Sequence, residues 1–178
     1  MSAASERREA FMAATGIQVP KGALFHGTSN ESAEAIMREG FRTDAGSRHR
    51  DEGAPPAVYL HHDPLVAAQH GPAVVVARRG GGPLANWGDM SHATIMGSHS
   101  SRRIPGVPME GRQEKYLEDY GHPGYKDPDD GATIITSPGV LKPFATSHSG
   151  QCPSCFGQGH HPRTWDSCST CSGKGVMW

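Results

Sequence analysis

Hydrophobic residues along this chain fall in short runs, separated by polar stretches that are rich in glycine and proline. Runs of β-branched, aromatic and aliphatic residues predict strands, and these cover 23–26, 57–60, 73–77, 133–136 and 140–145. Apolar residues at helical spacing predict helices, and these cover 5–14, 32–39, 63–71 and 111–120. Because strands and helices do not alternate regularly, the pattern favours an α+β fold over a parallel doubly wound sheet. We expect a small, mostly antiparallel sheet with flanking helices.

Local signals predict where the helices begin and end. Asp63 suits the N-cap of the third helix, and Pro64 suits its first helical position. Asn30 or Ser32 is expected to cap the second helix, and Gly40 is expected to end it. These signals predict that helices follow the first and second strands directly.

The same patterns predict which side chains of the first segments are buried. In the second helix, Ala33, Ile36 and Met37 are expected to face the core. Gly27 is expected to break the first strand, because glycine weakens a strand interior. The first strand would therefore end on His26, next to an unobstructed stretch of backbone.

Composition limits the class of protein. The chain has 178 residues, of which 35% are hydrophobic, and this suits a globular main domain with a small extra module. A formal net charge of −1 gives no general attraction to nucleic acid or to an anionic membrane. No apolar run approaches the roughly 18 residues that span a bilayer, and the polar segment 1–14 lacks the apolar core of a signal peptide. We therefore expect a cytoplasmic protein with reduced cysteines and no membrane partner.

The C-terminal segment contains two copies of the pattern C-x-x-C-x-G-x-G, at 152–159 and 168–175. They use all four cysteines of the chain: Cys152, Cys155, Cys168 and Cys171. Two C-x-x-C pairs supply the four thiolates of one tetrahedral structural zinc site, although redox dithiols or unliganded cysteines are the alternative. We predict a main domain over 1–148 and a zinc-binding hairpin over 149–178.

This tail resembles the cysteine-rich zinc region of the DnaJ chaperone family, which carries four such repeats and two zinc ions. The resemblance covers 152–175 only, and two repeats suffice for one zinc. The chain has no J-domain, so the resemblance implies a metal-stabilised hairpin and not a chaperone.

A second group of motifs lies in the first half of the chain. The sequence L-F-H-G-T-S at 24–29 places His26, Gly27 and Thr28 at a strand end. An imidazole, a hydroxyl and an open backbone suit a ribose hydroxyl and a carboxamide such as that of nicotinamide. Tyr59 lies on the next predicted strand and offers a flat ring for stacking.

Together these motifs resemble the histidine-tyrosine branch of the ADP-ribosyltransferase superfamily, which includes poly(ADP-ribose) polymerase-like enzymes and rifampin-modifying transferases. The resemblance implies a split-sheet α+β fold that binds NAD as a substrate. It implies that His26 binds a ribose of NAD, that the Gly27 backbone pairs with the nicotinamide amide, and that Tyr59 stacks on the nicotinamide ring. His70 takes the position of a second aromatic residue that covers the ring in polymerase-like members.

The chain departs from this family at the catalytic acid. Many members carry a glutamate at the start of a late strand, where this sequence has Ala132. Asp130 and its neighbour Asp129 precede that position, and Asp89 lies near the place of an aspartate that the rifampin-modifying group uses. Further candidates on a predicted surface helix are Glu114 and Glu118.

The missing glutamate argues against polymer elongation. We therefore expect an NAD-dependent mono-ADP-ribosyltransferase, a glycosyltransferase-class enzyme, with a macromolecular or small-molecule acceptor and a structural zinc. Two alternatives stay open. One is an RNA 2′-phosphotransferase-like enzyme, which needs basic groups such as Arg102 and Arg103 around a phosphate. The other is a non-catalytic protein that binds ADP-ribose or a nucleotide and uses the zinc hairpin to bind a partner.

Overall fold

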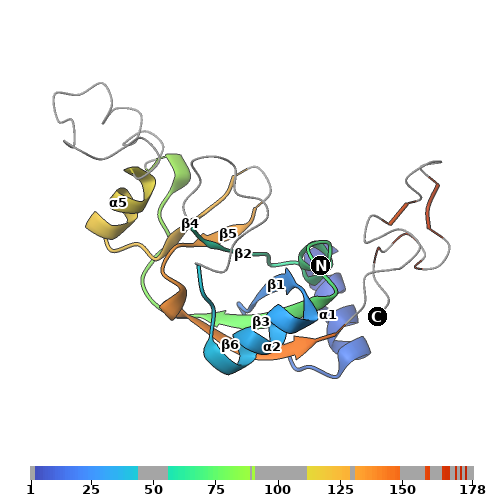
Figure 1. Ribbon diagram of the computed structural model, residues 1–178. Helices are drawn as coiled ribbons and strands as arrows, with labels where there is room; N and C mark the ends of the chain where they lie inside the picture. The colour runs from blue at the N-terminus through green and yellow to red at the C-terminus, as the bar shows by residue number, and fades with distance from the viewer. Residues whose placement is uncertain are drawn as a thin grey trace. The chain divides into compact units, whose positions relative to one another are not determined.

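The computed structural model describes residues 3–43, 56–88, 90, 112–128, 131–148, 159–160, 166–168, 171, 173 and 175 (Figure 1). The chain forms two compact units, each made of segments that are distant in sequence. The first comprises Met1–Phe41, Leu60–Arg79 and Leu141–Trp178, and the second comprises Arg42–Tyr59 and Gly80–Val140. The L-F-H-G-T-S motif at 24–29 lies in the first unit, and Tyr59 lies in the second.

The first unit is built on a three-stranded antiparallel sheet. Its strands are β1 (Leu24–Thr28), β3 (Ala73–Arg79) and β6 (Leu141–Ser147), in the order β1-β3-β6. Both pairs of neighbours are antiparallel. The predicted α+β class with small antiparallel sheets is therefore confirmed, and β3 and β6 each run two residues past their predicted ends.

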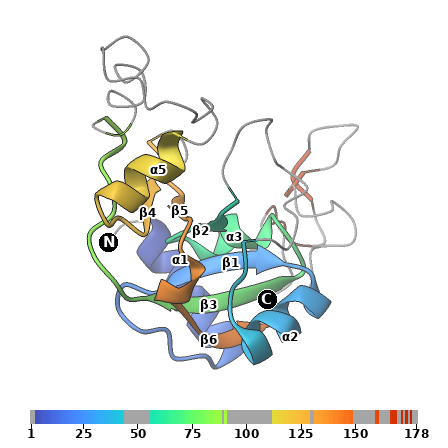
Figure 2. The same cartoon turned by 60° about the vertical axis from the view of Figure 1, so that its left-hand side comes forward.

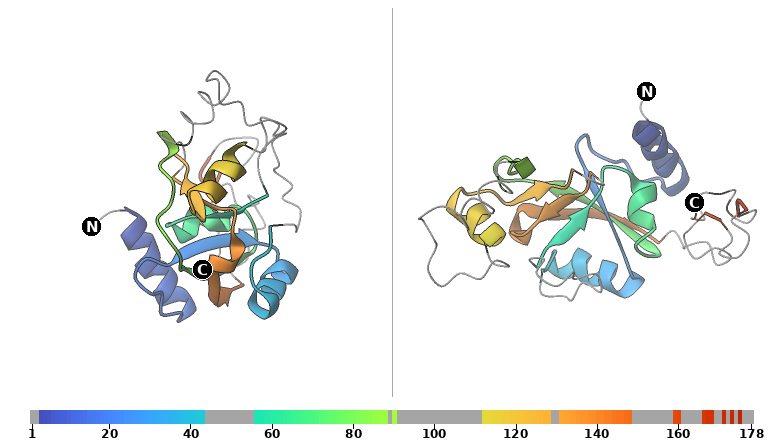
Figure 3. Two further views of the ribbon diagram at one scale, coloured as in Figure 1. Left: turned by 90° about the vertical axis from the view of Figure 1, so that its left-hand side faces the viewer. Right: turned by 90° about the horizontal axis from the view of Figure 1, so that it is seen from above.

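Helices cover both faces of this sheet. On one side lies α2 (Asn30–Glu39), and on the other lie α1 (Ala3–Thr15) and α3 (Pro64–Ala68). Figure 2 shows α2 and α3 on opposite sides of β1 and β3, and the left view of Figure 3 shows α1 and α2 flanking the same sheet. Side chains that alternate along β1 therefore meet two different environments.

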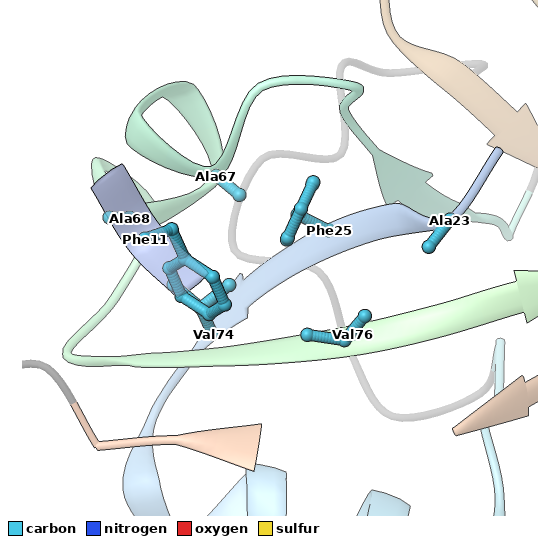
Figure 4. Packing of buried hydrophobic residues seen from close by; sticks show 7 residues of the cluster. All are labelled: Phe11, Ala23, Phe25, Ala67, Ala68, Val74 and Val76. Atoms are coloured by element: carbon cyan, nitrogen blue, oxygen red, sulfur yellow. The ribbon is translucent and has the colours of Figure 1, made fainter. Parts of the chain in front are cut away.

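The core of the first unit lies under α1 and α3. The Phe11 ring of α1 meets the Phe25 ring of β1 edge to face, with centroids 5.4 Å apart. Figure 4 shows these residues packed on the inner face of the sheet, and the cluster consists of Phe11, Ala23, Phe25, Ala67, Ala68, Val74 and Val76. All seven are buried, so hydrophobic contact fixes α3 to the central strand.

The helix ends agree in part with the sequence signals. Asp63 is the N-cap of α3, where its Oδ1 accepts the Leu65 N–H at 2.9 Å, and a proline occupies the first turn, as predicted. Gly40 ends α2 with a φ of 89°, also as predicted. The N-cap of α2 is Ser29, not Asn30 or Ser32, so that prediction was wrong.

Burial in α2 also differs from the prediction. Ala33 is fully buried, but Met37 is 38% exposed. The helix starts two residues earlier than predicted, and it turns Ala33 and not Met37 toward the sheet. Ile36 is half-buried between these extremes.

The second unit contains a smaller sheet and one helix. Its strands are β2 (Val58–Leu60), β5 (Thr133–Ile135) and β4 (Gly124–Lys126), in the order β2-β5-β4, and a 3₁₀ turn, η2 (Pro138–Val140), precedes β6. The helix α5 (Arg112–Asp119) agrees with the predicted range to within one residue at each end. Strand β4 was not predicted, because glycine and aspartate around it indicate turns. Gly124 is suited to a strand here, since a Cβ on it would overlap the Ile134 backbone.

None of the helices in the described segments has the length and apolar character needed to cross a lipid bilayer.

The contact of Asp63 with Arg7 gives a test of how α3 is held. Asp63 caps α3 and also pairs with the Arg7 guanidinium of α1 at 2.7 Å. Asp63→Ala should lower the free energy of unfolding by about 1–3 kcal/mol, because it removes a helix cap as well as an ion pair. Arg7 is 44% exposed, so Arg7→Ala should cost no more than about 1 kcal/mol. Urea unfolding followed by circular dichroism measures both, and equal losses would contradict the capping role.

Candidate functional site

The sequence predicts that the first strand ends on His26, but β1 continues through Gly27 to Thr28. The absence of a side chain explains this, because a Cβ on Gly27 would overlap the carbonyl oxygen of Ala67. A second glycine repeats the arrangement, since a Cβ on Gly71 would overlap the Thr28 carbonyl. Two glycines thus allow the end of α3 and the following turn to lie directly against the backbone of β1.

The outer edge of β1 is paired at one end and open at the other. Phe25 exchanges two backbone hydrogen bonds of 2.8 Å with His61, on the side away from β3. Backbone groups two residues apart in a strand point to the same side, so the Gly27 N–H and C=O also point outward. Within the described part of the chain, neither group forms a hydrogen bond. Gly27 therefore presents a donor and an acceptor side by side, as a planar carboxamide requires.

His70 lies beside this open edge. A Cβ placed on Gly27 would be 3.2 Å from the Cβ of His70, so the two residues are in direct contact. The His70 ring stacks on the His61 ring, with centroids 5.4 Å apart and planes inclined by 9°. His61 is buried and His70 is exposed. The pair forms a flat imidazole surface next to the Gly27 backbone.

His26 faces the opposite side of the strand. Its ring meets the Phe41 ring edge-on, with centroids 5.6 Å apart, and its strand partner is Val75. Because side chains alternate along a strand, His26 points toward the α2 side while Gly27 contacts α3 and His70. A ligand that touched both His26 and His70 would have to follow the outer edge of β1 between them.

Tyr59 belongs to the second unit. It is half-buried on β2 and packs against a buried cluster that includes Tyr125 and Ile134. Burial, together with smaller contributions from the neighbouring Tyr59 and Asp127, raises the pKa of Tyr125 to about 12. Tyr59 thus contributes to the packing of its own unit.

The candidate acids are only partly placed. Ala132, which the sequence resemblance aligns with the family glutamate, is buried with 1% exposure. Asp89, Asp129 and Asp130 lie outside the described residues. Glu118 is exposed on α5, and the side chain of Glu114 also lies outside the described part. The catalytic acid therefore stays a prediction.

In the C-terminal tail, the structure describes the second cysteine pair. Cys168 and Cys171 are buried, with 0% and 5% exposure, and the Gly175 N–H donates to the Cys171 Sγ at 3.1 Å. The described glycines of the repeats, Gly159, Gly173 and Gly175, have φ values of 77–79°, a left-handed conformation that favours glycine.

The Cys168 N–H donates to the Gly159 carbonyl at 2.8 Å, which links the two repeats. A bridge between His160 and Ser167 adds a second link. Amides that donate to sulfur are typical of the surroundings of metal thiolates, so the geometry around Cys171 fits a metal ligand. Cys152 and Cys155 lie outside the described residues, and no group of three or more metal-binding side chains occurs among the residues that are described.

Sequence reasoning assigned no role to His61. Its burial and its stacking on His70 depend on the bridge between His61 and β1, which is a contact between distant segments. The only local signal for His61 is that it follows Tyr59 by two residues along the chain.

Comparison of the chain with family models, with curated proteins and with solved structures gives no match. The case for function therefore rests on the residues themselves.

The close contact at Gly27 leads to a stability test. Gly27→Ala should lower the free energy of unfolding by about 2–3 kcal/mol or more, because the added methyl group overlaps backbone that cannot move independently. Gly139→Ala is the matched control, since a Cβ there meets nothing within 4 Å and its effect should stay within about 0.5 kcal/mol. Chemical unfolding of both variants measures the difference. A Gly27→Ala variant as stable as the Gly139→Ala variant would contradict the described packing.

Proposed function

We propose that the chain binds NAD along the outer edge of β1 and transfers its ADP-ribosyl group to an acceptor. The observation that carries the proposal is the open N–H and C=O of Gly27 next to the His61–His70 ring surface. A carboxamide can donate to one of these groups and accept from the other, while its ring lies against an imidazole. Nicotinamide has both parts, a flat ring and a carboxamide.

The course of β1 also suits the extended shape of NAD. His26 is on the α2 side of the strand and His70 is on the α3 side, with the open edge between them. A ribose held by His26 and a nicotinamide held by Gly27 would belong to one molecule that passes along this edge. The family resemblance gives Tyr59 the role of stacking on the nicotinamide ring, and this role stays a prediction because Tyr59 belongs to the second unit.

In the proposed reaction the bond between nicotinamide and the ribose C1′ breaks, and nicotinamide leaves with the electron pair. The acceptor then donates a lone pair to C1′ and loses its proton to a carboxylate or to water. Groups that hold the nicotinamide and the ribose in a strained, fixed orientation lower the barrier of the first step. A carboxylate near C1′ would stabilise the positive charge that develops there, and Asp130 and Asp89 are the candidates.

Binding without turnover is the second candidate function. It is favoured by Ala132, which is buried and uncharged where many family members carry the catalytic glutamate. In that case the same edge would bind NAD or ADP-ribose and release no nicotinamide.

We also propose that Cys152, Cys155, Cys168 and Cys171 hold one structural zinc ion. The support is the repeated C-x-x-C-x-G-x-G pattern, the burial of Cys168 and Cys171, and the amide that donates to the Cys171 sulfur. Zinc bound by four thiolates has no open position for a substrate, so its role would be to fix the tail.

Binding of NAD and release of nicotinamide test the proposed function. Wild-type protein should bind NAD in a calorimetric titration and release nicotinamide when the acceptor, or water, is present. Tyr59→Ala should weaken binding about fivefold to tenfold through loss of a ring contact, and Tyr59→Phe should retain it. His26→Ala should weaken binding as well.

The control is Tyr120→Ala, which removes a tyrosine that is 68% exposed in the same unit. It should leave NAD binding unchanged. Binding with no nicotinamide release would favour the non-catalytic candidate, whereas no binding of NAD at all would contradict both.

Metal content tests the zinc proposal. The purified protein should contain about one zinc per chain, and Cys168→Ser should lose it, while Ser169→Ala within the same loop should keep it. Chelation should loosen the tail and leave the first-unit sheet folded, because the cores of the two regions are separate clusters. Elemental analysis and circular dichroism measure both effects. Unfolding of the whole chain on chelation would show that the tail is not an independent module.

A further inference from the structure

The His61–His70 pair is an unusual surface for binding a nicotinamide ring. The two imidazoles stack almost in parallel, with centroids 5.4 Å apart. His61 is 6% exposed, and its backbone is fixed to Phe25 by two hydrogen bonds. His70 is exposed, so water reaches its ring and can deliver a proton.

The charge of the ligand makes this surface sensitive to protons. In NAD the nicotinamide ring carries a positive charge, because its nitrogen is bonded to the ribose. A neutral imidazole attracts such a ring through its π face, whereas an imidazolium at contact distance repels it. Histidine is the side chain that changes charge between about pH 5 and about pH 8.

We propose that protonation of the His61–His70 pair controls the binding of NAD, with the neutral pair accepting the cationic nicotinamide ring and the protonated pair rejecting it. This inference rests on the proposed function and specifies the regulation of that site. Two imidazoles at this separation resist a double charge, so one proton on the pair, carried by the exposed His70, is sufficient. A shift toward acid would therefore release NAD from the protein.

The described elements that pack against the pair also carry charged groups. Strand β1 contributes His26, which lies on the opposite face. Helix α3 (Pro64–Ala68) has no charged residue, and Asp63, its N-cap, pairs with Arg7. The remaining charged side chains on α1 and on the described residues 56–63 before α3 are Glu6, Arg8, Glu9 and His62.

The test is calorimetric titration of NAD at about pH 8 and about pH 5.5, a range that spans histidine titration. The affinity of the wild-type protein should fall on the order of tenfold at the lower pH. His70→Phe keeps a flat ring without a titratable group, so its affinity should be the same at both pH values. His62→Phe, which alters an exposed neighbour, should behave as wild type. Free nicotinamide, whose ring is neutral, should bind the wild-type protein with little dependence on pH.

A wild-type affinity that does not change with pH would overturn this inference and leave the proposed function standing. The same fall in His70→Phe would assign the effect to another group and would also overturn it. An equal fall for free nicotinamide would show that charge repulsion is not the cause. Absence of NAD binding at every pH would overturn the proposed function together with the inference. Circular dichroism at both pH values confirms that each protein is folded under the conditions used.

Discussion

The candidate site depends on one steric constraint, the direct backbone contact between β1 and the end of α3. Gly27 meets the Ala67 carbonyl and Gly71 meets the Thr28 carbonyl, and neither contact leaves room for a Cβ. The hydrophobic core beneath, with Phe25 on the strand and Ala67 on the helix, holds the two elements together. As a result, His70 is held in contact with the Gly27 backbone instead of projecting from a separate loop.

Pairing along β1 determines which backbone groups near this contact are available to bind a ligand. The bridge from Phe25 to His61 occupies the edge of the strand at one point, and the same alternation turns the Gly27 amide and carbonyl outward two residues later. The bridge also brings the His61 ring against His70. The edge of β1 thereby combines the N–H and C=O of Gly27 with the rings of His61 and His70. The side chain of His26 lies on the other face of the strand. These features are consistent with a ligand that has a ring, a carboxamide and a sugar in sequence.

Local chemistry in the sequence was enough to predict much of the fold. The β-branched run that became β3 and the Asp63-Pro64 start of α3 depend on neighbouring residues only, and both were predicted. The course of β1 through Gly27 and the existence of β4 were not predicted. In both places a glycine is needed because another backbone lies against it, and a distant backbone leaves no local signal.

The candidate site shows the same division. Motif order groups His26, Gly27 and His70 in the sequence, and the structure brings Gly27 close to His70, while their role in binding stays a prediction. His61 was overlooked, since its importance comes from a bridge to a strand more than thirty residues away. That His26 and His70 lie on opposite faces of β1 follows from strand alternation once the strand is known to continue through Gly27. The sequence predicts a strand that ends on His26, and such a strand would not extend the alternation to Gly27.

We propose that the Gly27 backbone binds the carboxamide of nicotinamide. The most direct measurement is the Gly27 amide resonance in a ¹H–¹⁵N NMR titration with nicotinamide, together with the rate at which this amide exchanges with solvent. We expect the Gly27 resonance to shift progressively to saturation and its hydrogen exchange to slow as the ligand binds. A Gly27 resonance and an exchange rate that stay unchanged while nicotinamide or NAD binds elsewhere would contradict it.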